Sequence, residues 1–196
     1  MIIGLCGLIG SGKGTVADIL VTQGYRKLSF ADRLKDGVAA MFGWDRKMLE
    51  GDTEESRKWR EELDFFWTRE TGGDVTPRLV LQLYGTECMR DGFFDGVWVS
   101  LVKQELLKHP NDNFVIPDVR FQNEIKMIQS LGGQIWRVRR GLDPIWLRRY
   151  EKNNIIPSTI HPSEWDWATA QMDRLINNDS DKSYLKSQVA DHLAST

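Results

Sequence analysis

Short apolar runs alternate along this chain with longer stretches whose apolar residues recur every three or four positions. The runs predict strands, and they cover residues 2–6, 25–30, 114–117, 134–139 and 174–176. The helical spacings predict helices, and they cover residues 16–20, 34–42, 97–107, 124–131 and 183–193, with a further helix from Pro77. We expect the helices from Pro77 and at 97–107 to cover the sheet. This alternation is typical of an α/β fold, a parallel sheet with helices on both faces.

Two segments interrupt the alternation. Residues 44–76 carry alternating charges with interspersed aromatic residues, and we expect an insertion there, outside the sheet. Tryptophans at helical spacing more often bury a small local core or a dimer face than stack on bases. Residues 140–165 carry arginines and paired asparagines without a continuous apolar stripe, which favours a mobile, lid-like flap. At this length we expect residues 1–196 to form a single domain.

Composition and charge narrow the function. The net charge of −2 argues against a sequence-independent grip on nucleic acid, which would need a basic excess. The apolar runs fall far short of the roughly 20 residues that a membrane span needs, and no leader precedes the first strand, so we expect a cytoplasmic protein without a membrane partner. Cys6 and Cys88 are too few for a disulfide framework or a metal knuckle, and we expect reduced thiols in packed positions.

A glycine-rich stretch, residues 7–15, stands between the first strand and the first helix. Glycines let backbone amides curve around phosphate oxygens, a lysine reaches the terminal phosphates, and a helix N-terminus attracts anions. The stretch therefore predicts a phosphate loop, with nucleotide-binding residues Gly10, Ser11, Gly12, Lys13, Gly14 and Thr15. Its Gly-Lys-Gly-Thr ending resembles the loop of adenylate kinase and related kinases, in which the hydroxyl, here that of Thr15, serves the Mg²⁺–phosphate cluster. The alternative is a glycine-rich turn with an exposed lysine.

Three polar residues, Asp118, Arg120 and Glu124, follow the strand at 114–117, where open α/β sheets bind ligands. One interpretation makes Asp118 a carboxylate on the Mg²⁺ side. Another makes all three residues ligands of a phosphate acceptor, because the planar fork of an arginine gives a phosphate two parallel hydrogen bonds. A third is structural: Asp118 caps the following helix, and Arg120 and Glu124 form an exposed ion pair one helical turn apart.

A cluster of arginines occurs late in the chain, and its members are Arg137, Arg139, Arg140, Arg148 and Arg149. Phosphoryl transfer builds negative charge that arginines on a closing segment can stabilise. We expect most of the cluster to be solvated and Arg139 to be the leading catalytic candidate, beside Lys13, Asp118 and Arg120. The sequence at 161–164, His-Pro-Ser-Glu, is interpreted as a structural turn, because no second histidine or cysteine stands nearby to bind a metal.

Taken in order, several motifs resemble those of bacteriophage-type deoxynucleoside monophosphate kinases. Beyond the loop they comprise residues 30–35, 82–87 with Trp98, 116–120 with Glu124, 132–133, 161–164 and 178–179. The resemblance implies a P-loop NTPase fold with inserted monophosphate-binding and lid segments. It also implies transfer of the γ-phosphoryl group of ATP to a deoxynucleoside monophosphate with Mg²⁺, often by a homodimer, in the host cytoplasm if a phage encodes the chain. The monophosphate site would comprise Lys35, Arg78, Thr86, Arg90, Trp98, Asp118, Arg120 and Glu124.

The chain departs from that pattern at two places. Gly14 stands where members of the family often have aspartate, and residues 44–76 are shorter than the insertion of larger members, so base selection is not carried over. Two other functions stay open at this point. One is a P-loop kinase of another small metabolite, such as dephospho-coenzyme A, and the other is a nucleotide-binding switch that transfers nothing.

Overall fold

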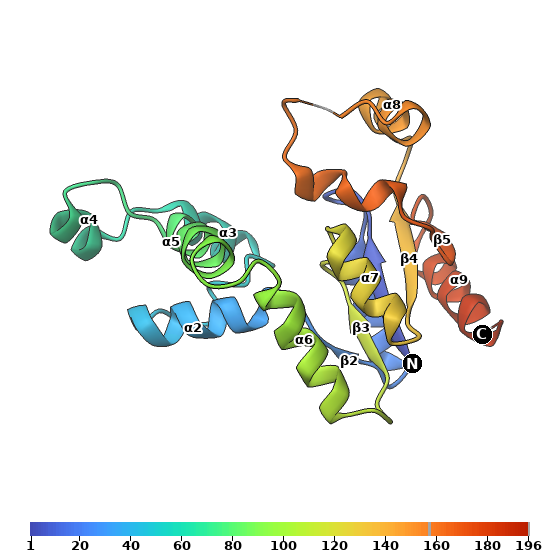
Figure 1. Cartoon of the computed structure of the whole chain (residues 1–196). Coiled ribbons are helices and arrows are strands. Elements are labelled where there is room, and N and C mark those ends of the chain that lie inside the picture. The colour runs from blue at the N-terminus through green and yellow to red at the C-terminus, as the bar shows by residue number, and fades with distance from the viewer. Residues whose placement is uncertain (157, 196) are drawn as a thin grey trace. The chain divides into compact units, whose positions relative to one another are not determined.

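The computed structural model describes residues 1–156 and 158–195 of the chain. Residue 157, in the segment predicted to be a flap, and residue 196 lie outside the described residues. The chain divides into two compact units (Figure 1). Unit 1 comprises Met1–Ser29 and Val102–Thr196, and unit 2 comprises Phe30–Leu101.

Unit 1 contains a parallel sheet whose strands follow the order β2-β3-β1-β4-β5. The strands are β1 (Ile2–Cys6), β2 (Arg26–Lys27), β3 (Phe114–Ile116), β4 (Gln134–Arg139) and β5 (Arg174–Asn177). The first strand is central, because Gly4 pairs with Ile116 on one side and with Ile135 on the other. The predicted strands are therefore confirmed, although the run at 25–30 contributes only Arg26 and Lys27.

Helices cover both faces of this sheet. Ile3 and Leu5 are fully buried in a core shared with α1 (Lys13–Thr22) and α9 (Lys182–Ala194). Gly4 points to the opposite face, where a Cβ atom would lie 2.7 Å from Ile128 Cδ1 of α7 (Gln122–Ser130). Alternate residues of a strand face opposite sides, so the missing side chain at Gly4 lets α7 pack directly on β1. The predicted α/β fold class is confirmed.

The segment predicted to be a flap contains regular structure. It includes α8 (Ile145–Asn153) and a 3₁₀ turn (Pro162–Glu164), and a second 3₁₀ turn (Asp166–Thr169) follows. Leu147 of α8 is fully buried, and the Tyr150 ring packs edge-on against Trp165 at 4.8 Å. The expectation that this segment lacks an apolar face is wrong for α8, because residues three positions apart lie on one helix face.

Unit 2 is helical. Its elements are α2 (Asp32–Phe42), α3 (Glu54–Glu61), α4 (Phe65–Thr71), α5 (Pro77–Leu83) and a π-helix (Tyr84–Asp91), and the boundary with unit 1 falls inside α6 (Val97–Lys108). The α5 helix begins at Pro77 because the Thr76 hydroxyl caps it by accepting the Leu79 amide at 3.1 Å. It packs against α2 and α3 within unit 2, and the expectation that it covers the sheet stays a prediction.

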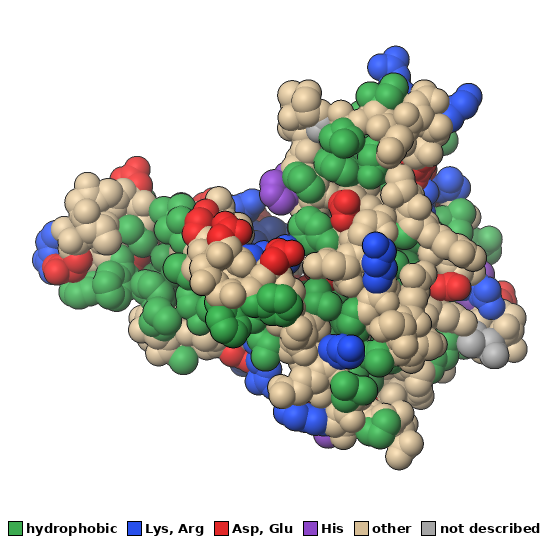
Figure 2. All heavy atoms as spheres, in the orientation of Figure 1, with side chains coloured by type: hydrophobic (Ala, Val, Ile, Leu, Met, Phe, Trp, Pro, Cys, Tyr) green, Lys and Arg blue, Asp and Glu red, His purple; other side chains and the backbone are tan. Residues whose placement is uncertain are grey.

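The aromatic residues of segment 44–76 build the core of unit 2. Phe42 stacks on Trp44 at 4.7 Å, and Trp44 meets Trp59 edge-on at 5.9 Å, around the buried Val38. The interpretation of these aromatics as a small local core is confirmed. Other aromatic residues of the segment lie outside this core: Phe65 on α4 is 85% exposed, and Figure 2 shows apolar side chains on the surface of unit 2.

Among the described helices, none is long and apolar enough to cross a membrane.

Candidate active site

The loop between β1 and α1 presents free backbone amides. In the described part of the chain, no carbonyl or side chain accepts the amides of Lys13, Gly14 or Thr15, and the first helical bond runs from Val16 to the Gly12 carbonyl at 3.0 Å. No side chain caps this helix either. The first turn of a helix concentrates partial positive charge on such amides, so this end of α1 is suited to bind a phosphate.

The loop is clamped to the segment after β5. Gly12 has a φ of 99°, and a Cβ atom there would lie 2.2 Å from Asn178 Nδ2. That same amide nitrogen donates to the Ser11 carbonyl at 2.9 Å. Only glycine permits both this backbone conformation and this close approach. Asn178 therefore fixes the curve of the phosphate loop from a position more than 160 residues away along the chain.

Lys13 is held by its own loop. Its Nζ donates to the Gly7 carbonyl at 2.7 Å and to the Leu8 carbonyl at 2.9 Å. Burial lowers the pKa of Lys13, and the positive charge of Arg120 lowers it further, while Glu164 and Asp118 act in the opposite direction. The ammonium group thus lies in the loop as a partly desolvated cation with carbonyl partners that an anionic ligand can replace.

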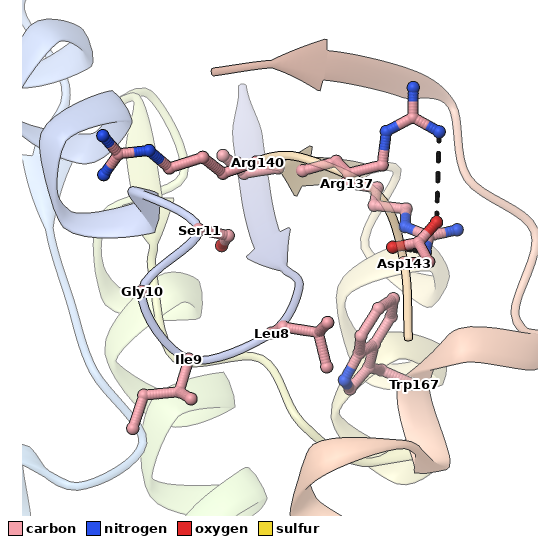
Figure 3. Close-up of a pocket in the computed structure, with 10 residues that line it drawn as sticks. Leu8, Ile9, Gly10, Ser11, Arg137, Arg140, Asp143 and Trp167 are labelled. Atoms are coloured by element: carbon pink, nitrogen blue, oxygen red, sulfur yellow. Dashed lines mark ion pairs between the residues drawn. The ribbon is translucent and has the colours of Figure 1, made fainter. Parts of the chain in front are cut away.

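A pocket of about 520 Å³ opens in front of the loop, a size typical of small-molecule sites. Its lining comprises loop residues 7, 9, 10 and 12–15 together with Pro117, Arg120, Arg140, Ser163, Glu164 and Asn178. Three of these side chains are cationic, those of Lys13, Arg120 and Arg140, and one is a carboxylate, that of Glu164. A second, smaller pocket of about 130 Å³ is lined by loop residues 8–11 and by residues that include Asp143 and Trp167. Arg140 lines both pockets, and Figure 3 shows its side chain extending away from Asp143 and Trp167.

The residues after β3 divide into pocket and support. Glu124 is only 2% exposed, and its Oε2 accepts the amides of Arg120 at 2.7 Å and Phe121 at 3.0 Å. The interpretation of Arg120 and Glu124 as an exposed ion pair is therefore wrong, because the Glu124 side chain turns inward and fixes the backbone that carries Arg120. Asp118 does not cap α7, whose N-cap is Phe121, and its Oδ2 accepts the Ser29 hydroxyl at 2.6 Å.

Two members of the arginine cluster, Arg137 and Arg139, are held in structural contacts, while Arg140, Arg148 and Arg149 are exposed. Arg137 pairs with Glu151 at 2.7 Å and with Asp143 at 3.0 Å. Arg139 donates from Nη2 to Asn177 Oδ1 at 2.8 Å and lies outside the larger pocket. Arg140 lines that pocket instead, so it is a candidate that sequence reasoning did not single out, and the catalytic role of Arg139 stays a prediction. Residues Arg148 and Arg149 of α8 line neither pocket.

The 161–164 segment is a turn, as predicted, and it also reaches the pocket. His161 Nδ1 accepts the Ser163 amide at 3.2 Å and so caps the 3₁₀ turn. Ser163 and Glu164 line the pocket with the loop residues. Sequence reasoning missed this second role, and the only available signal was the place of these residues in the family motif order.

The pocket fits a magnesium ion that arrives with a nucleotide. Thr15 lines it, and the Thr15 hydroxyl makes no hydrogen bond to any residue that the structure describes. Mg²⁺ prefers oxygen ligands and usually takes one or two from the protein while phosphates and waters supply the rest. No group of three or more histidine, cysteine, aspartate or glutamate residues converges anywhere in the described ranges. The donor set therefore suits a metal–phosphate complex and not an all-protein cage.

The other predicted substrate residues lie in unit 2. Lys35 Nζ pairs with Glu50 at 2.6 Å, and Arg78 pairs with Glu61 at 2.7 Å. The Trp98 indole is buried and donates to the Gly85 carbonyl at 3.0 Å, a packing contact within unit 2. Thr86 and Arg90 lie on the π-helix. The binding roles of all five residues stay predictions.

Arg60 is a unit 2 cation that sequence reasoning missed. Its Nε is buried without a hydrogen-bond partner, and no ion pair or hydrogen bond to a described residue uses its guanidinium. The Gly51 backbone lies against that group, since a Cβ at Gly51 would be 2.2 Å from Arg60 Cζ. Burial lowers the pKa of Arg60, and the charge of Arg78 lowers it further. Glu61 and Glu50 act on the pKa in the opposite direction, but neither is within ion-pair distance of the Arg60 guanidinium. A half-buried arginine without an ion pair to a described residue is a candidate anion ligand.

These features define a class. A phosphate loop after the central strand of a parallel sheet, with uncapped helix amides and three cations lining the pocket before it, is the site of a P-loop phosphate-binding protein.

Comparison with known proteins makes the class more specific. No family model matches the chain. A protein of Acanthamoeba polyphaga mimivirus named "Putative deoxynucleotide monophosphate kinase" is 32% identical over 177 residues, which cover 84% of this chain and 80% of that protein. The deoxynucleoside-5′-monophosphate kinase of Escherichia phage T5 is 38% identical over 56 residues, which cover 29% of this chain and 22% of that enzyme. The chain belongs to the deoxynucleoside monophosphate kinase family and is a phosphotransferase.

Solved structures that resemble the chain include two small-molecule kinases. The dephospho-CoA kinase from Campylobacter jejuni matches with a TM-score of 0.46 at 14% identity, over 99% of this chain and 96% of that one. The shikimate kinase from Aquifex aeolicus matches with a TM-score of 0.46 at 13% identity, over 100% of this chain and 97% of that one.

Proposed function

We propose that the protein transfers the γ-phosphoryl group of ATP to a deoxynucleoside 5′-monophosphate and so produces the diphosphate for DNA precursor synthesis. The observation that carries this proposal is the pocket at the phosphate loop, lined by three cations, in a chain of this family. Clustered positive charge beside free helix amides suits a polyphosphate donor.

On the donor side, the loop amides and Lys13 hold the terminal phosphates, and Asn178 keeps the loop curved. Mg²⁺, when bound, neutralises charge on the phosphates, and the Thr15 hydroxyl is the residue that would hold it. Arg120 and Arg140 face the same pocket and stabilise the negative charge on the transferred group. Catalysis of this kind consists of positioning and charge stabilisation, with no covalent step on the protein.

On the acceptor side, we infer from the family resemblance that Lys35, Arg78, Thr86, Arg90 and Trp98 bind the monophosphate. The same resemblance makes Asp118 and Arg120 candidates. Arg60 is a further candidate, because no hydrogen bond or ion pair to a described residue engages its guanidinium, while Lys35 and Arg78 are paired with carboxylates. Glu124 acts by fixing the Arg120 backbone. Segment 140–165, which carries Arg140 and Glu164, is the part that we expect to order further when both nucleotides bind.

The test is an ADP-release assay coupled to NADH oxidation, run with ATP, Mg²⁺ and a panel of acceptors. The panel holds the four deoxynucleoside monophosphates, the four ribonucleoside monophosphates, dephospho-coenzyme A and shikimate. We expect turnover with at least one deoxynucleoside monophosphate and none with the non-nucleotides. Turnover confined to a non-nucleotide acceptor would refute the proposal, and so would tight ATP binding with no acceptor-dependent ADP release.

A further inference from the structure

Glu164 is the one carboxylate that lines the larger pocket among the described residues, and it faces three cations. A carboxylate there is unfavourable for a bare polyphosphate, because like charges repel strongly where solvent is partly excluded. The three cations offset part of this repulsion. A metal ion between Glu164 and the phosphates would turn the remaining repulsion into attraction.

The structure fixes Glu164 in place through its neighbours. The Trp167 indole donates to the Glu164 carbonyl at 3.1 Å, and the Glu164 amide donates to the His161 carbonyl at 3.0 Å. Gln122 at the start of α7 binds Asp166 twice, from its backbone amide and from its side chain, each at 2.7 Å. This chain of contacts links the turn that carries Glu164 to Gln122, two residues after Arg120.

Arg120 and Glu164 form a long ion pair without a hydrogen bond. The distance from Arg120 Nη1 to Glu164 Oε1 is 3.9 Å, beyond hydrogen-bond distance. The Glu164 side chain is 28% exposed, so it remains open toward the pocket. The carboxylate therefore lines the same pocket as Lys13 and Thr15, and its oxygens stay accessible there.

We propose that Glu164 is the protein carboxylate that recognises the magnesium ion of the metal–nucleotide complex, together with the Thr15 hydroxyl. This inference rests on the proposed function, since it assumes an ATP donor at the loop. Asp118, the other carboxylate considered for this role, does not line the pocket, and one of its oxygens is occupied by the Ser29 hydroxyl. Hard oxygen donors such as a carboxylate and a hydroxyl are the ligands that Mg²⁺ takes in nucleotide sites.

The electrostatic interaction between Glu164 and the nucleotide changes sign when the metal binds. Without metal, Glu164 repels the nucleotide phosphates, and with metal it attracts the metal–nucleotide complex. The residue therefore makes the pocket select metal-bound nucleotide over free nucleotide. A residue that merely positions Arg120 would change the affinity for both forms in the same direction.

The experiment measures binding of the non-hydrolysable ATP analogue AMP-PNP by isothermal titration calorimetry, once with Mg²⁺ and once with EDTA. The proteins are the full-length wild type, Glu164→Gln, Glu164→Asp and the control Asp18→Asn, which removes a negative charge from an exposed position on α1. We expect Glu164→Gln to bind metal-free AMP-PNP a few-fold more tightly than the wild type does. The factor by which Mg²⁺ raises AMP-PNP affinity should be about tenfold smaller in this variant than in the wild type. Glu164→Asp should keep part of the gain, and Asp18→Asn all of it.

Mn²⁺ gives a second readout that does not involve activity. We expect electron paramagnetic resonance to show weaker Mn²⁺ retention in the AMP-PNP complex of Glu164→Gln than in that of the wild type. An unchanged Mg²⁺ gain in Glu164→Gln, or equal losses with and without metal, overturns the inference while leaving the kinase proposal intact. If wild-type AMP-PNP binding is absent or is unaffected by Lys13→Ala, the donor site itself is refuted, and the inference with it.

Discussion

Replacing Gly12 by alanine tests the clamp between the phosphate loop and Asn178. Two perturbations combine there. The residue has a φ of 99°, where a side chain is strained at a cost of about 1–2 kcal/mol. The added methyl would also lie 2.2 Å from Asn178 Nδ2, so the amide must move and lose its 2.9 Å bond to the Ser11 carbonyl. A hydrogen bond of this kind contributes about 0.5–1.5 kcal/mol, which gives a total loss of about 1.5–3.5 kcal/mol.

Two neighbouring glycines provide matched controls for this substitution. Gly10 has a φ of 77° and open space around a Cβ atom, so Gly10→Ala should cost only the strain, about 1–2 kcal/mol. Gly14 lies in the first turn of α1 with nothing within 4 Å of a Cβ and no positive φ, so Gly14→Ala should be neutral or stabilising by up to about 1 kcal/mol. From the most to the least stable protein, the expected order is Gly14→Ala, wild type, Gly10→Ala and Gly12→Ala.

Urea denaturation, monitored by circular dichroism, measures these differences in the free energy of unfolding. A double-mutant cycle isolates the contribution of the contact between the loop and Asn178. Asn178→Ala alone should cost about 1 kcal/mol, and in the Gly12→Ala background it should cost nearly nothing, because the bond is already broken. AMP-PNP affinity should fall in both single variants, since each frees the loop. Equal stability of Gly12→Ala and Gly10→Ala, or full additivity in the cycle, would show that the contact with Asn178 contributes nothing.

Three further results are expected. Burial raises the pKa of Cys6 to about 12, so iodoacetamide at pH 8 should label the exposed Cys88 and spare Cys6. Mass spectrometry measures the labelling, and in urea both thiols should react. Labelling of Cys6 in the native protein would contradict its burial. Arg140→Ala should lower kcat at least about tenfold, and Arg139→Ala should mainly lower the unfolding midpoint; the reverse pattern in steady-state kinetics and melting would restore Arg139 as the catalytic arginine. Arg60→Lys should raise KM for the monophosphate about tenfold and leave KM for ATP unchanged, because lysine cannot make the bidentate contact of an arginine. An equal KM for the monophosphate in the wild type and in Arg60→Lys would remove Arg60 from the acceptor site.

The sheet and the phosphate loop were predictable because their signals are local. Apolar runs of three to six residues fall at the strands, and the glycine spacing needs only a preceding strand and a following helix to be interpreted. The short extent of β2 was not predictable, since only Arg26 and Lys27 meet a partner strand, and that depends on the position of β3. Cys88 likewise proved exposed against the expectation of a packed thiol, because it lies on the outer side of the π-helix.

The lining of the pocket was only partly predictable. Arg140, Glu164 and Asn178 reach it through contacts that span most of the chain, and neither spacing nor residue type identifies such contacts. The orientation of Glu124 is a similar case. Its spacing from Arg120 suits an ion pair on a helix surface, but the helix begins at Gln122, which turns the carboxylate back onto the preceding amides. For Trp98 the motif order alone predicts a substrate role; its indole donates to the Gly85 carbonyl, a contact that residue type and spacing do not indicate.

Direct observation of the transferred group tests the central claim. ATP labelled on its γ-phosphate is incubated with Mg²⁺, the wild-type protein and each deoxynucleoside monophosphate in turn, and the nucleotides are separated by chromatography. The account predicts label in the β-phosphate of a deoxynucleoside diphosphate, and none with a folded Lys13→Ala variant, which lacks the cation of the phosphate loop. Label released only as inorganic phosphate, or diphosphate formation that survives in Lys13→Ala, would contradict it.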